Sequence, residues 1–226
     1  MCETRSMTVR ATLFDMDGLL INSELFWHEA ELEIFGSLGV PEAVLNERST
    51  KGVFVAEVVR HWRAIYPWTG PSNEDVVQQI LNRVGELIEE KGAMLPGAER
   101  AVAMASARGP VALASSTPLW LIQRNLAHFG ITDLFATVNS AEFETHGKPH
   151  PAVFLSAAAA VHTAPTECLV FEDAAAGVIA AKAGRMKVVA VPMASDKDQP
   201  AFALADLVLN SLEELTEAWM DEAFGL

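Results

Sequence analysis

Two carboxylates separated by a single residue follow an apolar run near the start of the chain. Asp15 and Asp17 come directly after residues 9–14, and Gly18 turns the chain away behind them. If the apolar run is a buried strand, side chains two apart share a face, so both carboxylates reach one small volume. Asp and Gly are also common in ordinary strand-to-loop turns, so the pair indicates chemistry only if suitable partners lie elsewhere.

Polar side chains also follow two further apolar runs, each where a strand would end, and a lysine lies in a segment that two prolines stiffen. Each of these residues alone is an ordinary cap or turn former. In a parallel sheet, however, the carboxyl ends of the strands meet at one edge, and ligands bind there. The candidates are Ser115, Ser116, Lys148, Glu172 and Asp173.

Together these residue types supply the parts that phosphoryl transfer needs. A phosphate monoester repels a carboxylate, so a divalent cation and a fixed positive charge must neutralise it before Asp15 attacks phosphorus. Oxygen ligands such as Asp15, Asp173 and a carbonyl suit Mg²⁺. Lys148 and Ser115 would hold the phosphate oxygens. Asp17 remains to protonate the leaving oxygen and later to accept a proton from the hydrolytic water.

The hydrophobic pattern predicts a doubly wound parallel α/β sheet that positions these residues. Short apolar runs alternate with amphipathic segments from about residue 95 onward, which favours strands joined by helices. The expected strands are residues 9–14, 111–114, 134–138, 168–171, 188–191 and 207–209. The expected helices are residues 98–108, 120–129, 151–161, 174–183 and 212–224.

A helical block interrupts this sheet after its first strand. Residues 20–91 show helical periodicity and no convincing strand, and Ser72 before two acidic residues is a typical helix N-cap. We therefore expect a catalytic α/β core over residues 1–19 and 92–226, with residues 20–91 forming a separate all-helical insert.

The composition limits the partners and the compartment. Half of the 226 residues are apolar and the formal charge is -14, which disfavours nucleic acid and anionic membranes because both reward clustered Lys and Arg. Cys2 and Cys168 make no plausible disulfide framework, and the second is expected in the core. No run is long and apolar enough for a membrane span, and residues 1–8 lack the apolar centre of a secretory signal. We expect a cytoplasmic protein, a monomer or weak dimer, that binds a small phosphate ester.

Four short motifs follow one another along nearly the whole sequence: residues 14–18 (FDMDG), 113–116 (LASS), 148–151 (KPHP) and 171–173 (FED). In this order they make the chain resemble the haloacid dehalogenase superfamily. The resemblance implies a Rossmann-like core with an inserted α-helical cap and a bound Mg²⁺. It implies Asp15 as nucleophile, Asp17 as acid/base and carbonyl ligand to the metal, Asp173 as direct ligand, and Glu172 as ligand through water.

The position of the insert, between the first and second motifs, makes the chain similar to the beta-phosphoglucomutase-like group, which carries its α-helical cap there. Within it, residues 18–24 and 66–72 resemble bacterial 2-deoxyglucose-6-phosphate and hexitol phosphatases. Two departures stand out, because Asn22 replaces the usual Asp and three alanines at 174–176 replace more polar residues. The first is expected to weaken hydrogen bonding beside the cap hinge, and the second to remove support from the metal shell.

In this group the cap determines the substrate, especially its first helix and the loop at residues 49–54. Relatives often carry an arginine shortly after the loop glycine, whereas Phe54 and Val55 stand there in this chain, so a second anionic group on the substrate would be held less well. Glu24 and His28 lie four apart on one helix face and either contact sugar hydroxyls or form an exposed polar face. The residues expected in the core of the cap are Trp27, Trp62 and Trp68.

The leading interpretation is a Mg²⁺-dependent phosphatase that acts on a hexose or hexitol phosphate, in preference to phosphoglycolate, through an aspartyl phosphate. A phosphomutase would use the same residues and retain the phosphoenzyme until the substrate reorients, so the sequence hardly separates the two. Dehalogenation is disfavoured because it needs neither Asp17 nor a metal. Phosphonate cleavage is disfavoured because its Schiff-base lysine follows the cap-loop glycine, whereas Lys51 precedes it. A non-catalytic binding module would be expected to lose Asp15 or Asp17.

Overall fold

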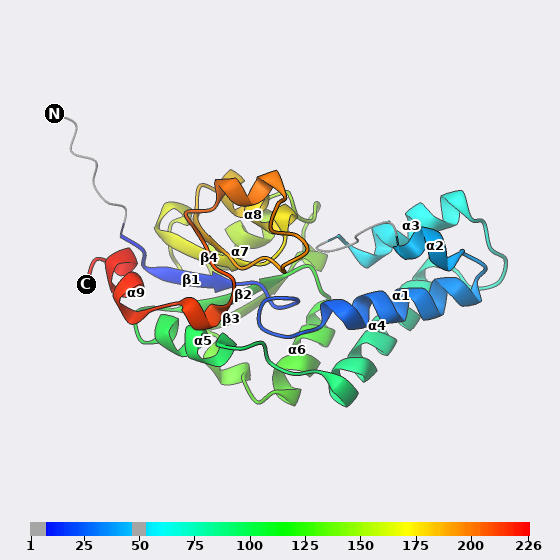
Figure 1. Ribbon diagram of the computed structural model, residues 1–226, viewed down its shortest axis with the longest axis horizontal. Coiled ribbons are helices and arrows are strands. Elements are labelled where there is room, and N and C mark those ends of the chain that lie inside the picture. Colours follow the sequence, from blue (N-terminus) through cyan, green and yellow to red (C-terminus); the bar gives the residue numbers. More distant parts are fainter. Residues whose placement is uncertain (1–7, 47–52) are drawn as a thin grey trace.

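The computed structural model describes residues 8–46 and 53–226 (Figure 1). Cys2 and the cap-loop residues 49–52, which include Lys51, lie outside the described residues. The predicted doubly wound α/β fold is confirmed: six parallel strands form one sheet in the order β3-β2-β1-β4-β5-β6. The strands are β1 (Ala11–Phe14), β2 (Val111–Ser115), β3 (Thr137–Ser140), β4 (Cys168–Glu172), β5 (Lys187–Ala190) and β6 (Leu207–Val208).

Helices cover both faces of the sheet, as a buried parallel sheet requires. Because successive strand residues point to opposite faces, Leu13 packs in the hydrophobic cluster under α7 and α8, whereas Phe14 packs in the cluster over α5, α6 and α9. The ring of Phe14 stacks on that of Phe171, with ring centroids 4.7 Å apart. Cys168 is fully buried, as predicted. The flanking helices are α5 (Ala98–Ser106), α6 (Leu119–His128), α7 (Ala152–Ala160), α8 (Ala175–Ala183) and α9 (Glu217–Phe224).

The chain order places the first strand at the centre of the sheet, between β2 and β4. The strands β2 and β3 lie on one side of β1, and β4, β5 and β6 lie on the other, so the strand order reverses at β1. Such a reversal opens a crevice at the carboxyl ends of the strands, which is where α/β sheets bind ligands. Asp15, Ser115 and Glu172 all lie at this edge.

The helices α1 (Glu24–Ser37), α2 (Glu42–Asn46), α3 (Val55–Ile65) and α4 (Asn73–Lys91) lie together at one end of the molecule (Figure 1). Both α1 and α3 pack along α4. The helix α4 begins with a capping box, in which Ser72 Oγ accepts from the Asp75 backbone N–H and the Asp75 carboxylate accepts from that of Ser72. Within the described residues, no helix is both long and apolar enough to cross a bilayer.

The two linkers that join these helices to the sheet run side by side. Ile21 and Met94 form an antiparallel bridge, and the backbone N–H of Leu95 donates to Leu20 O over 2.8 Å. The amide Oδ1 of Asn22 accepts from the Ala93 N–H at 2.7 Å. The hydrogen bonding expected to weaken at Asn22 is therefore present, because a carboxamide oxygen accepts a backbone N–H as a carboxylate does.

Candidate active site

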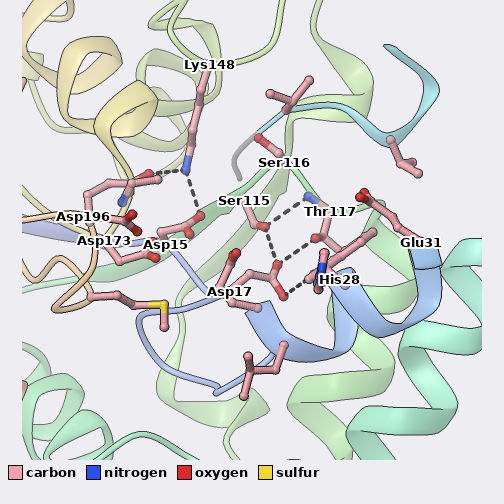
Figure 2. Close-up of a pocket in the computed structure, with 18 of the residues that line it drawn as sticks. Asp15, Asp17, His28, Glu31, Ser115, Ser116, Thr117, Lys148, Asp173 and Asp196 are labelled. Carbon is pink, nitrogen blue, oxygen red and sulfur yellow. Dashed lines mark hydrogen bonds and ion pairs between the residues drawn. The ribbon is translucent and has the colours of Figure 1, made fainter. Parts of the chain in front are cut away.

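A buried lysine joins two carboxylates at the carboxyl edge of the sheet. Lys148 Nζ donates to Asp15 Oδ1 at 2.8 Å and to Glu172 Oε1 at 2.6 Å, and the carbonyl of Ala114 lies 3.4 Å away. The side chain of Lys148 is 2% exposed and that of Glu172 is fully buried. One cation therefore holds the ends of β1 and β4 at a common point, as Figure 2 shows for Asp15.

Burial and charge act against each other at this lysine. Burial raises the pKa of Asp15 to about 7, although the ammonium of Lys148 lowers it, and the carboxylates of Glu172 and Asp17 add to the rise. Burial alone would lower the pKa of Lys148, but attraction to Asp15 and Glu172 raises it above its ordinary value. The lysine is thus a permanent positive charge, and Asp15 needs further positive charge to stay ionised at neutral pH.

The carboxylate of Glu172 is engaged by the protein on both oxygens. Oε1 accepts from Lys148, and Oε2 accepts from the backbone N–H of Ala174 at 2.8 Å, where α8 begins. Gly177 makes this fit possible, because a Cβ on that residue would lie 1.7 Å from Oε1. Ala174 keeps this contact to Glu172, since the donor is a backbone group that any residue except proline supplies.

Three buried carboxylates can share a cation. Oxygen atoms of Asp15, Glu172 and Asp173 lie within 4.8 Å of one another, and all three residues are buried. Gly18, at φ +74°, lets the loop approach them, because a Cβ there would meet Asp173 Oδ2 at 2.3 Å. An all-oxygen, strongly negative donor set is the chemistry that Mg²⁺ prefers, so the residues fit the predicted metal.

Asp17 points toward α1 and the loop after β2 (Figure 2). Its Oδ1 accepts from Ser23 Oγ at 2.6 Å and from Trp27 Nε1 at 3.1 Å. Its Oδ2 accepts from Thr117 Oγ1 at 2.7 Å, with Ser115 Oγ at 3.4 Å. The two predicted acids therefore reach one pocket but have different partners.

The prediction for the tryptophans was partly wrong. Trp62 and Trp68 are buried among the α1–α4 helices as expected, but Trp27 is only partly buried and lines the pocket beside Asp17. Sequence reasoning also missed Thr117. The available signals were weak: Trp27 lies one turn after Ser23, and Thr117 extends the polar run that begins at Ser115.

The pocket has a volume of about 410 Å³, and its outer wall comes from α1, α2 and the loop after β5. Glu24 and His28 both line it, and His28 Nε2 shares a hydrogen bond of 2.8 Å with Asn46 Oδ1. Glu31, one turn further along α1, is buried in the same wall and was missed because its burial depends on tertiary packing. The remaining outer residues are Leu25, Val53, Val55, Met193, Ser195 and Asp196.

The charge of this pocket is strongly asymmetric. Seven of its lining residues are acidic, and among the lining residues that the structure describes Lys148 is the sole lysine or arginine. Ser116 and Thr117 line it beside Ser115, at the end of β2. Phe54 is not part of the lining; its ring lies against Gly147, where an added Cβ would be 2.5 Å from Cε2. The described part of the loop at residues 49–54 thus packs beside Gly147, the residue before Lys148, instead of offering a cation.

Comparison with known proteins agrees with this geometry. The family model of haloacid dehalogenase-like hydrolases matches residues 9–185. The chain belongs to this family. Hexitol phosphatase B of Escherichia coli K12 is 43% identical over 210 residues, which cover 92% of this chain and 95% of that protein. The alignment includes both the sheet and the α1–α4 helices.

Solved structures share the whole architecture. The crystal structure of CbbY from Rhodobacter sphaeroides in complex with phosphate has a TM-score of 0.80 at 25% identity, and covers 92% of this chain and 96% of its own. Beta-phosphoglucomutase from Clostridium difficile has a TM-score of 0.80 at 23% identity, covering 96% and 98%. The second likeness concerns the fold alone.

Proposed function

We propose that this protein is a Mg²⁺-dependent phosphatase that hydrolyses small sugar phosphates of the hexose or hexitol type through an aspartyl phosphate. The observation that carries the proposal is the buried ion pair of Asp15 with Lys148 at the switch point of the sheet. Similarity to hexitol phosphatase B over nearly the full length of both proteins supports the substrate class.

In the proposed mechanism Asp15 is the nucleophile. Lys148 neutralises the phosphate, and Ser115 and Ser116 bind its remaining oxygens through hydroxyl and backbone groups. When bound, Mg²⁺ would be held by Asp15, Asp173, the carbonyl of Asp17 and, through water, Glu172, and would neutralise charge on the phosphate oxygens.

Asp17 carries the proton in both half-reactions. It protonates the leaving sugar oxygen as the bond from phosphorus to that oxygen breaks, and then accepts a proton from the water that attacks the aspartyl phosphate. The water's oxygen forms the new bond to phosphorus, inorganic phosphate leaves, and Asp15 is regenerated as a carboxylate.

The helices at residues 20–91 would act as a cap over the core at residues 1–19 and 92–226, closing to exclude water and opening to release product. Glu24 and His28 would contact hydroxyls of the sugar. The acidic outer wall favours a neutral, hydroxyl-rich leaving group, because a second phosphate or carboxylate would be repelled by nearby acids. A monomer or weak dimer in the cytoplasm remains our expectation.

A phosphate-release panel tests this function. We expect the highest kcat/KM in Mg²⁺ on a hexose or hexitol monophosphate, at least tenfold above phosphoglycolate, pyrophosphate or nucleotides. Asp15→Asn should abolish turnover, since an amide is not a nucleophile here. Wild-type activity in that variant, or activity unchanged after complete metal removal, would refute the mechanism. Sugar phosphates that isomerise without releasing phosphate would instead indicate a mutase.

A further inference from the structure

The carboxylate of Asp17 is held from two sides that belong to different parts of the molecule. Ser23 and Trp27 lie at the start of α1 and both donate to Oδ1. Thr117 and Ser115 follow β2 and approach Oδ2. Asp17, the proposed proton carrier, therefore links α1 to the end of β2 through its hydrogen bonds (Figure 2).

The indole of Trp27 is not explained by packing alone. It is only partly buried, lines the pocket, and directs its single N–H at an acid that comes ten residues earlier in the chain. An indole has one donor and no acceptor, and its ring turns as a rigid unit, so this contact fixes the direction of Asp17 more closely than a flexible donor would. In contrast, Trp68 uses its N–H within the α1–α4 helices, on Pro71 O at 3.3 Å.

We propose that Trp27 is a positioning residue for Asp17, and that with Ser23 it makes the acid/base carboxylate follow α1. This inference rests on the proposed phosphatase function. Since one donor to Oδ1 is the N-cap residue of α1 and the other lies in its first turn, a shift of that helix moves Oδ1 relative to the phosphate site beside Asp15. The position of α1 therefore sets how well Asp17 is aimed at the leaving oxygen.

The test is the dependence of phosphoryl transfer on the leaving group. A general acid matters most when the leaving oxygen is basic and least when it departs unaided, as from 4-nitrophenyl phosphate. Phenyl phosphates with graded phenol acidity keep the shape of the leaving group nearly constant. Their kcat/KM values report all steps up to phosphoenzyme formation, so hydrolysis of the aspartyl phosphate does not enter.

Trp27→Phe removes the N–H and keeps an aromatic ring. We expect kcat/KM to fall about tenfold for the ester of the least acidic phenol and by no more than about twofold for 4-nitrophenyl phosphate. The tenfold loss is a fraction of the roughly 10²–10⁴-fold that a general acid contributes in total. Ser23→Ala, which removes the second donor to Oδ1, should steepen the same dependence. Trp68→Phe is the matched control and should leave the dependence unchanged, whatever it does to thermal stability.

An equal loss of kcat/KM on all the phenyl phosphates would assign Trp27 to binding or folding and overturn the inference. Wild-type kcat/KM values on all of them would also overturn it. A rise in KM for sugar phosphates with unchanged leaving-group dependence would also overturn it, because the indole would then contact the sugar. Absence of wild-type turnover on every ester would refute the proposed function itself and this inference with it.

Discussion

In the proposed function, the buried carboxyl group of Asp15 binds either a proton or the metal cation. Burial raises its pKa to about 7, so the metal-free protein holds a proton there over a pH range in which the unfolded chain, with an ordinary aspartate, does not. The sign follows: protonation of Asp15 stabilises the metal-free fold at low pH, and this contribution is lost as pH rises from about 4 toward 7. A divalent cation favours the ionised form.

We therefore predict that Mg²⁺ binds more weakly below pH 7 and releases close to one proton per ion at pH 6. Titration calorimetry in buffers of different ionisation enthalpy measures this release directly. Asp15→Asn is the control, and Mg²⁺ binding to it should release no proton from residue 15. Equal affinity at pH 6 and pH 8 in the wild type would contradict the assignment of the proton to Asp15.

A second residue-scale prediction concerns Gly177. Alanine there would place its Cβ 1.7 Å from Glu172 Oε1, which displaces the carboxylate from Lys148 and leaves a buried charge poorly paired. We expect Gly177→Ala to cost about 3 kcal/mol or more in unfolding free energy and to reduce turnover at least tenfold. Gly36→Ala, in α1 with no atom within 4 Å of the new Cβ, is the matched control and should be neutral or slightly stabilising in chemical denaturation.

At this scale the sequence predicted residues whose position follows from strand ends. Asp15 and Asp173 directly follow the buried strands β1 and β4, so their meeting at one edge follows from the fold. Lys148 lies in the proline-flanked turn before α7 and reaches Asp15 from there. Trp27 and Glu31 could not be predicted in the same way. Their place in the pocket depends on the angle at which α1 meets the sheet, which no local pattern encodes.

Among the elements, the segment that precedes α3 packs against the loop that carries Lys148. The ring of Phe54 fills the space where Gly147 has no side chain. We predict that Gly147→Ala pushes the ring and the lysine loop apart, lowers the free energy of unfolding by about 1–3 kcal/mol, as overpacking typically does, and lowers turnover because Lys148 is displaced. Phe54→Ala should leave a gap beside Gly147. The double variant should nevertheless lose less kcat/KM than the two single losses predict when they are combined.

A double-mutant cycle on kcat/KM measures this coupling. Strictly additive losses would mean that the ring and the glycine act independently. Gly36→Ala is again the control. Gly130→Ala is unsuitable, because Gly130 adopts a positive φ that alanine disfavours.

Element types were predicted better than element ends. The expected closing helix over residues 212–224 is instead a short 3-10 turn, Leu212–Glu214, followed by α9, because Thr216 caps a new helix by accepting from the Trp219 N–H. The expected strand at residues 134–138 begins later, at Thr137, after a 3-10 turn. The helix α2 was missed, since five residues are too few to show a helical period.

For the molecule as a whole, α1 and the loop after β5 both line the pocket, so relative movement of these parts would change its opening. We predict that a reducible crosslink between cysteines introduced at Leu25, on α1, and Met193, in the loop after β5, suppresses sugar phosphate turnover at least tenfold. Both side chains are exposed enough to react. Reduction should restore activity, and each single cysteine variant treated alike is the control. Unchanged turnover in the crosslinked protein would rule out gating by this helix.

The parallel sheet and the insertion point of α1–α4 were predicted, because strand patterns alternate with helix patterns except over residues 20–91. The strand order was not predicted from the sequence, and neither was the path of the linkers. Residues 20–22 and 93–95 pair through backbone groups, and pairing of that kind leaves little trace in side-chain patterns.

This pairing of the linkers also bears on how the chain folds. The first two neighbouring strands, β1 and β2, are separated by about 95 residues, so pairing them in a disordered chain closes a long loop. If the α1–α4 helices and their paired linkers form first, the loop that remains is about a quarter as long, and its closure costs roughly 1 kcal/mol less. In that folding order, the helices that line the pocket would also lower the entropic cost of pairing the central strands.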